Sequence, residues 1–195
     1  MDLRAVLNCC LVKIEKRYQD QDGNITIDPT WRPEEYATLE GTVVSVPLKI
    51  DGEVTGSLRQ GDKIVFSYCV VYDFKEQPDN ATPIYKNLVI INGEEYWIVD
   101  VEEIFFKLTD KIEMVTDNCL IEPFEFKAGD TISNGLLIKN NRIENKGIIK
   151  GLPAYYRNAR VGDTVFFEPR FVQKYNILGK EHFIIPIRRM LAKAN

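Results

Sequence analysis

The apolar residues of this chain fall into short runs separated by turn residues. β-Branched and aromatic side chains dominate these runs, as at Val43–Val46 and Ile64–Phe66, and such runs are typical of β-strands. Gly-Asp, Gly-Glu and Gly-Lys pairs stand before several of them and favour tight turns. Helical periodicity is missing except for a helical turn at 33–38 and a short helix near 188–193. The pattern therefore predicts an all-β protein.

The runs recur as four blocks, in the same order, in the two halves of the chain. The offset between matching blocks falls from 109 residues (119 − 10) to 86 residues (179 − 93), which places the length differences in loops, where they are tolerated. The blocks are CLVKIE and CLIEPF, from Cys10 and Cys119; EGTVVSVP and KGIIKGLP, from Glu40 and Lys146; RQGDKIVF and RVGDTVFF, from Arg59 and Arg160; and NGEEYWIVDVEEIFF and LGKEHFIIPIRRMLA, from Asn92 and Leu178.

An ordered repeat of this kind indicates a duplicated domain. The boundary predicted from the blocks divides the chain into residues 1–109 and residues 110–195. Each half contains several short strands with regularly spaced turns, and this arrangement favours a small β-barrel. The sequence thus predicts two tandem β-barrels, of which the first has the longer loops.

One apolar segment stands apart from the predicted strands. Leu136, Leu137 and Ile138 follow Ser-Asn-Gly and precede Lys-Asn-Asn-Arg. A surface loop rarely carries three consecutive large aliphatic side chains, because their exposure to water is unfavourable. The tripeptide is therefore either a short core strand or a segment that a partner covers.

The ordered blocks resemble GroES-type co-chaperonins, and the resemblance covers nearly the whole chain. In the second half, Cys119-Leu-Ile-Glu matches the family's opening strand, and Gly135-Leu-Leu-Ile stands where the family's loop has Gly-Ile-Val-Leu. Val161-Gly-Asp-Thr-Val-Phe-Phe matches a later Gly-Asp strand, and Arg189-Met-Leu-Ala matches the closing segment. In the first half, Gly23-Asn-Ile-Thr-Ile occupies the loop position.

This resemblance implies a GroES-like barrel fold and a function for the two loops. In the family, a loop that is disordered alone becomes ordered when its aliphatic tripeptide enters a groove on a GroEL-type chaperonin. The resemblance also implies a homo-oligomeric ring that caps the chaperonin without catalysis and without a cofactor. The chaperonin-binding residues that it implies are Leu136, Leu137 and Ile138 in the second half and Ile25, Thr26 and Ile27 in the first.

The chain also departs from the family pattern. Members usually hold one copy per chain, whereas this chain holds two and is similar to the double co-chaperonins of plastids, although no transit peptide is visible. Thr26 interrupts the first tripeptide, and the alternation of Ile25, Thr26 and Ile27 is also typical of a half-buried strand. The divergence is of the kind expected for a virus-encoded version.

Composition and charge narrow the function classes. No run of about 18 apolar residues is present, so no membrane span is expected. The four cysteines lack CxxC spacing and the only histidine is His182, which argues against a metal site and favours reduced thiols in the cytoplasm. Residues 1–110 carry a charge of −9 (11 − 20) and residues 111–195 a charge of +5 (14 − 9).

Three function classes remain open. No catalytic motif is found, and a single histidine excludes most His-based catalytic sites, so an enzyme is not expected. A structural or assembly protein built from the same two barrels, including a viral one, is the first alternative. A single-strand nucleic-acid binder is the lesser alternative, because the chain is acidic. The basic and aromatic residues available for it are Arg157, Arg160, Arg170, Lys174, Tyr155, Phe171 and Tyr175.

Overall fold

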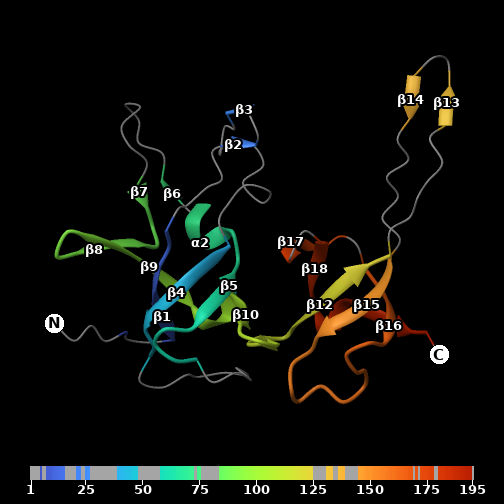
Figure 1. Ribbon diagram of the computed structural model, residues 1–195. Helices are drawn as coiled ribbons and strands as arrows, with labels where there is room; N and C mark the ends of the chain where they lie inside the picture. The colour runs from blue at the N-terminus through green and yellow to red at the C-terminus, as the bar shows by residue number, and fades with distance from the viewer. Residues whose placement is uncertain are drawn as a thin grey trace. The chain divides into compact units, whose positions relative to one another are not determined.

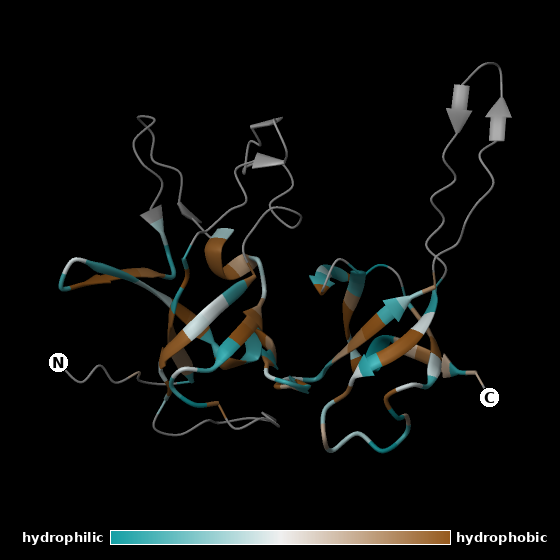
Figure 2. Ribbon diagram, in the orientation of Figure 1, coloured by the Kyte–Doolittle hydropathy of each residue, from teal (hydrophilic) through white to brown (hydrophobic). Residues whose placement is uncertain are grey.

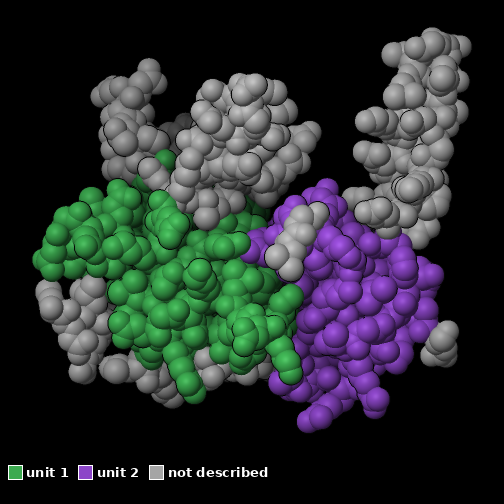
Figure 3. All heavy atoms as spheres, in the orientation of Figure 1, with its two compact units in different colours: residues 1–117 green, residues 118–195 purple. Residues whose placement is uncertain are grey.

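The computed structural model describes residues 5, 8–15, 39–47, 58–72, 85–124, 145–168, 170, 172–177 and 180–194, together with the strand placement of residues 21–22, 25–26, 74–75, 84, 131–133 and 136–138. The chain forms two compact units, residues 1–117 and residues 118–195 (Figure 3). Each unit is built on one large antiparallel sheet, which confirms the prediction of an all-β protein.

The sheet of the first unit has seven strands in the order β11-β10-β5-β4-β1-β9-β8 (Figure 1). Burial alternates along β1, where Cys10 and Val12 are buried and Lys13 is exposed, because successive residues of a strand face opposite sides of the sheet. The strands are β1 (Cys9–Lys13), β4 (Glu40–Ser45), β5 (Lys63–Phe66), β8 (Leu88–Ile91), β9 (Glu94–Asp100), β10 (Ile104–Leu108) and β11 (Ile112–Met114).

The sheet of the second unit has six strands in the order β17-β18-β12-β15-β16-β19. Brown, hydrophobic positions mark the strands of both units in Figure 2, and along β15 buried positions alternate with less buried ones. The strands are β12 (Asn118–Pro123), β15 (Lys146–Gly151), β16 (Thr164–Phe167), β17 (Gln173–Ile177), β18 (Lys180–Pro186) and β19 (Met190–Lys193).

The two sheets have the same strand order once β11 is set aside. The first reads β10-β5-β4-β1-β9-β8 and the second β19-β16-β15-β12-β18-β17. The register agrees as well, because Leu11 pairs with Ile98 on β9 and Leu120 pairs with Ile184 on β18. A register shift follows Leu11 and Leu120 alike in the pairing with the next strand. The two units therefore repeat the same strand order and the same register at single residues.

The same Gly-Asp turn precedes β5 and β16. In the first unit, Gly61 has a φ of +90°, and the Arg59 N–H donates to Asp62 Oδ2 at 2.8 Å. In the second unit, Gly162 has a φ of +96°, and the Arg160 N–H donates to Asp163 Oδ2 at 2.9 Å. Glycine is favoured at this position because a Cβ is strained at positive φ, which explains why both halves keep the Gly-Asp pair.

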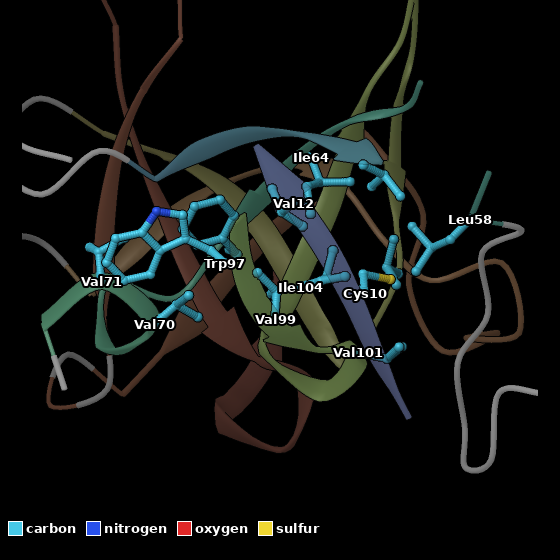
Figure 4. Packing of buried hydrophobic residues seen from close by; sticks show 13 residues of the cluster. Cys10, Val12, Leu58, Ile64, Val70, Val71, Trp97, Val99, Val101 and Ile104 are labelled. Carbon is cyan, nitrogen blue, oxygen red and sulfur yellow. The ribbon is translucent and has the colours of Figure 1, made fainter. Parts of the chain in front are cut away.

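Each unit has its own hydrophobic core. In the first unit Trp97 is almost fully buried and meets the Tyr85 ring edge-on, with 5.8 Å between ring centroids. In the second unit Phe167 and Phe183 form an edge-on pair at the same distance. Figure 4 shows the first core, which gathers side chains from strands β1, β5, β9 and β10 and from a short helix, and its labelled residues are Cys10, Val12, Leu58, Ile64, Val70, Val71, Trp97, Val99, Val101 and Ile104.

Helices are short in the described part of the chain. α2 (Cys69–Tyr72) was not foreseen from the sequence, and it contributes Val70 and Val71 to the first core. The short helical segment predicted near 188–193 is present only at its start. A 3₁₀ turn, η3 (Ile187–Arg189), is followed directly by β19, which pairs with β16, and η1 (Val101–Glu103) precedes β10 in the same way. The helical turn predicted at 33–38 lies outside the described residues.

Among the described residues, no helix is both long enough and apolar enough to span a bilayer. The remaining elements are three pairs of very short strands, each pair forming a sheet of its own. β6 (Phe74–Lys75) pairs with β7 (Ile84–Tyr85). The other two pairs contain the predicted binding residues.

Candidate partner-binding hairpins

Two hairpins occupy the same place in the two repeats. The first hairpin joins β2 (Gln21–Asp22) to β3 (Ile25–Thr26) and lies between β1 and β4 in the chain. The second hairpin joins β13 (Thr131–Ser133) to β14 (Leu136–Ile138) and lies between β12 and β15. Among the strands that the structure describes, each hairpin forms a two-stranded sheet separate from the large sheet of its unit.

The predicted binding residues lie on these hairpins. Leu136, Leu137 and Ile138 make up β14, where they are paired with Ser133, Ile132 and Thr131, respectively. Ile25 and Thr26 form β3, where they are paired with Asp22 and Gln21. Ile27 lies outside the described residues. The tripeptide is thus a strand, as one of the two sequence interpretations had it, but a strand outside the six-stranded sheet.

The segment that carries the second hairpin leaves the six-stranded sheet after Phe124 and returns to it at Asn145, and these two ends with their neighbours on β12 and β15 form the root of the hairpin. Pro123 at the end of β12 pairs with Gly147 on β15, and the Phe124 N–H donates to the Lys146 carbonyl oxygen at 3.1 Å. The Phe167 N–H in turn donates to the Asn145 carbonyl oxygen at 2.9 Å. The two ends of the segment between Phe124 and Asn145 therefore leave the sheet at neighbouring positions.

Aromatic rings flank the lysine at this root. Lys146 Nζ lies 5.3 Å from the centroid of the Phe124 ring and 5.6 Å from that of Phe166. Both rings are partly exposed, and an ammonium within about 6 Å of an aromatic face is attracted by the ring quadrupole. The sequence analysis did not identify this cluster, because Phe124 follows β12, Lys146 is on β15 and Phe166 is on β16, and only the fold brings them together.

Gly147 is required at the root by the space available. A Cβ at this position would overlap Ile121 Cγ2 and would lie 2.6 Å from the Glu122 carbonyl oxygen. The equivalent residue of the first repeat, Gly41, is crowded in the same way by Val12 Cγ1. The close approach of β4 to β1, and of β15 to β12, therefore explains the glycine that both halves share.

Charge at the root is balanced by a carboxylate between two ammonium groups. Glu122 Oε2 lies 2.5 Å from Lys150 Nζ, and Glu122 Oε1 lies 3.3 Å from Lys180 Nζ. The hydrogen bond from Lys150, assisted by that from Lys180, lowers the pKa of Glu122. The carboxylate is therefore ionised at neutral pH.

The cysteines differ in exposure, and all four are free thiols. Burial raises the pKa of Cys10 and of Cys119 to about 12, so both remain protonated near neutral pH and are poor nucleophiles. Burial and then the Asp100 carboxylate raise the pKa of Cys9. Within the described part of the chain, no three or more His, Cys, Asp and Glu side chains gather to hold a metal ion.

The residues proposed for nucleic-acid binding are only partly available as a basic surface. Lys174 Nζ is paired with Glu181 Oε2 at 2.9 Å. Tyr175 is the next residue of β17, and neighbouring residues of a strand face opposite sides of the sheet. Tyr155, Arg157 and Arg160 are exposed on the segment between β15 and β16, and Arg170 is exposed as well. Phe171 lies outside the described residues.

Comparison of the chain with known proteins does not assign it to a family. No protein-family model matches the chain, and a search of curated proteins returned no match. The resemblance to co-chaperonins therefore rests on the residues of the two repeats.

Proposed function

We propose that this chain is a co-chaperonin-like protein that caps a GroEL-type chaperonin and assists folding without catalysis. In this proposal each large sheet closes into a small GroES-like barrel, and several chains form a homo-oligomeric ring. The hairpins hold the chaperonin through Leu136, Leu137 and Ile138 and through Ile25, Thr26 and Ile27. The protein acts in the cytoplasm, where free thiols such as those of its four cysteines persist.

The observation that carries the proposal is the placement of the hairpins. Both follow the first strand of their repeat, and both form sheets separate from the large ones. A segment kept in both copies of a duplicated domain, yet outside both large sheets, is poorly explained by the stability of either sheet. A binding role explains the aliphatic tripeptide on β14 as a surface that a partner covers.

The energetics suit a cap that must be released. Burying three aliphatic side chains contributes about 1.5–3 kcal/mol each. An isolated two-stranded hairpin is marginally stable, and ordering its residues on binding costs roughly 1 kcal/mol or more apiece, which offsets much of that gain. One hairpin therefore binds weakly, whereas a ring that presents many hairpins binds tightly and reversibly through effective concentration.

The two hairpins are unequal in this proposal. β14 offers three consecutive aliphatic residues, whereas the Ile25-Thr26-Ile27 segment has a hydroxyl in its centre. Moving a hydroxyl out of water without a new hydrogen bond costs free energy. The second hairpin is therefore the principal contact with the chaperonin, and the first hairpin is the auxiliary one.

Co-sedimentation with the GroEL chaperonin in the presence of ATP tests the proposal. The wild-type chain should sediment with the chaperonin, and a triple variant with Leu136→Ser, Leu137→Ser and Ile138→Ser should not. The matched control is Ile90→Ser, which removes an exposed aliphatic residue of β8 outside the hairpins and should bind as wild type does. Far-UV circular dichroism establishes that each variant is folded. Equal binding by the triple variant, or no binding by wild type, contradicts the proposal.

A structural or assembly protein is the second candidate function. The observation that favours it is the outer edge of β19, which no strand in the described part of the chain covers. This candidate predicts assembly into large particles and no ATP-dependent binding to a chaperonin. The nucleic-acid alternative predicts retention on single-stranded DNA that falls steeply with salt, and the pairing of Lys174 with Glu181 weakens it.

A further inference from the structure

The two large sheets end in edge strands of different character. β8 ends the sheet of the first unit and β17 ends that of the second, and among the described residues no strand pairs with the outer side of either (Figure 1). The two strands are equivalent in the repeat, because β8 pairs with β9 as β17 pairs with β18. An uncovered edge presents backbone N–H and C=O groups that can pair with a strand of another chain.

The side chains of β17 protect its edge against such pairing, and those of β8 do not. β8 reads Leu-Val-Ile-Ile, whereas β17 reads Gln-Lys-Tyr-Asn-Ile. In the shared register Lys174 takes the place of Leu88, and charge on an edge strand opposes pairing. Asn176 takes the place of Ile90 in the same way. Ile90 is 68% exposed, so the first unit leaves an aliphatic side chain in water where the second unit has an amide.

The backbone groups of Leu88 and Ile90 point to the uncovered side of β8. The Ile98 N–H donates to the Asn87 carbonyl oxygen at 2.7 Å, so Asn87 is bonded to the chain of β9. Successive residues of an antiparallel strand bond alternately to one side and to the other. Val89 is therefore bonded to β9 as well, and Leu88 and Ile90 face outwards.

The two ends of this edge carry opposite charges. Lys86 is exposed just before β8, and Glu95 is exposed on β9 close to the turn that follows β8. A second copy of β8 that runs antiparallel brings the basic end of each copy towards the acidic end of the other. A parallel copy would bring like charges together, which is unfavourable. The edge is thus complementary to itself in one orientation, and this favours a second copy of the chain as its occupant.

We propose that β8 of one copy pairs antiparallel with β8 of a second copy, about a two-fold axis at Val89. In this register Leu88 of each copy pairs with Ile90 of the other, so the outward backbone groups of both residues become bonded. Paired residues lie on the same face of a sheet, so Ile90 of one copy covers Leu88 of the other. Leu88 packs against the first core, and the contact therefore extends that core from one copy to the next.

The turn after β8 decides between this register and its neighbour. Asn92 has a φ of +53°, so the extended strand ends before it. An axis at Ile90 would set Leu88 opposite Asn92, where no extended partner is available. An axis at Val89 gives Leu88 and Ile90 an extended partner each.

The contact goes beyond the proposed function, because it uses neither hairpin. A two-fold contact is isologous and joins copies in pairs. It adds a second kind of contact to the one that would close a ring, and it needs no chaperonin.

Disulfide trapping in the full chain tests the register. Val89 meets itself across the axis as a non-hydrogen-bonded pair, and the Cα separation of about 4.5 Å in such pairs suits a disulfide. Val89→Cys in a Cys69→Ser background should therefore form a covalent dimer on air oxidation. The matched control is Tyr175→Cys, the equivalent position of β17, in the same background, and it should not cross-link. The inference is overturned by no cross-link at Val89→Cys, by equal cross-linking at Tyr175→Cys, or by cross-linking at Ile90→Cys alone.

Sedimentation velocity of the full chain without chaperonin measures what the exposed isoleucine contributes. Ile90→Lys should weaken pairing by about tenfold or more, because a charge on an edge strand opposes pairing. Since the contact joins copies in pairs, its loss should halve the mass of the wild-type particle. Asn176→Lys, the matched change on β17, should leave that mass unchanged. A mass that Ile90→Lys does not lower, or that both variants lower equally, would overturn the inference.

The charges at the two ends allow a rescue experiment. In the proposed register Lys86 of each copy lies opposite Asn92 of the other, close to Glu95. Lys86→Glu should weaken pairing at low salt, and adding Glu95→Lys should restore it. General destabilisation cannot produce such a restoration. A double variant that pairs no better than Lys86→Glu alone would contradict the register.

Failure of this inference is distinguishable from failure of the capping proposal. Ile90→Lys should still sediment with the GroEL chaperonin and ATP, because the hairpins of each copy are intact without the two-fold contact. Pairing without chaperonin binding would overturn the capping proposal alone. Chaperonin binding without pairing would overturn this inference alone.

Discussion

Lys13 Nζ lies 3.2 Å from Glu94 Oε2, and the equivalent positions of the second unit hold the same pair with its charges exchanged. There Glu122 takes the place of Lys13, and Lys180 takes the place of Glu94, at 3.3 Å. The two repeats have therefore kept a contact between the first strand and its neighbour while changing both residues. The contact therefore requires opposite charges at the two positions, and either position can carry the positive one.

The exchange predicts how variants of the first pair behave. Lys13→Glu places two carboxylates opposite each other and should lower the urea midpoint of unfolding slightly, because the pair is exposed to solvent. Adding Glu94→Lys should restore the midpoint. The check is urea unfolding followed by tryptophan fluorescence, at low and at high salt, and the single variant's defect should shrink in high salt. A double variant less stable than the single one would contradict the account.

The crowding at the two shared glycines predicts unequal costs. Gly147→Ala should lower the free energy of unfolding by about 1–3 kcal/mol, the range for overpacked sites. Gly41→Ala should cost less, because the nearest backbone oxygen is 3.1 Å from the added Cβ there and 2.6 Å from it at Gly147. Urea unfolding of both variants measures the difference. A smaller effect at Gly147 than at Gly41 would count against the close approach described here.

The cysteines should differ in reactivity in the order of their exposure. Cys69 is exposed and should be modified by a maleimide in the native protein. Cys10 and Cys119 should react only after unfolding, because burial excludes the reagent and raises the pKa of each thiol to about 12. Mass spectrometry of the labelled protein, with a Cys69→Ser variant as control, measures this. Rapid native labelling at Cys119 is the result that the structure forbids.

The same two thiols predict a loss of stability in alkali. Their folded pKa of about 12 lies above the ordinary value of 9.0. The unfolded state therefore releases protons first as the pH rises, and stability falls above about pH 9. The urea midpoint of a Cys10→Ala variant should fall less steeply between pH 9 and pH 11 than that of wild type. Parallel slopes would show that the thiols do not contribute.

Glu122 predicts a change at the acid end of the pH range. Its pKa is lowered from 4.5 by Lys150 and Lys180, so its contribution to stability is complete above pH 4.5 and is lost as the pH falls through the lower folded value. Glu122→Gln should lower the urea midpoint at pH 7 and flatten its dependence on pH below 4.5. Lys150→Gln, which removes the first partner, should flatten the dependence in the same direction. A steeper acid profile in either variant would contradict the ion pair.

Strand positions could be predicted from the sequence because residues with few substitutes mark them in both halves. The glycine of each Gly-Asp turn needs a positive φ, and Gly41 and Gly147 need space, so the two halves kept these residues in register while other residues changed. The offsets of the four blocks consequently agree with the pairing of Leu11 with Ile98 and of Leu120 with Ile184.

The errors and omissions have a different origin. The segment near 188–193 has an apolar spacing compatible with a helix, but pairing of β19 with β16 decides its structure. The tripeptide Leu136–Ile138 reads equally well as a core strand or as a partner-binding segment, because the sequence does not show which strand it pairs with. The pairing of β11 with β10 and the cluster around Lys146 were beyond reach for the same reason, since both are tertiary contacts.

Hydrogen exchange of the backbone amides tests the central claim of a capping function most directly. Exchange is measured by mass spectrometry on the full chain, alone and with the GroEL chaperonin and ATP. The account predicts that amides of residues 131–138 exchange more slowly in the complex, that those of residues 21–26 slow to a smaller extent, and that the strands of the two large sheets are unchanged. Equal exchange of residues 131–138 with and without the chaperonin would contradict it.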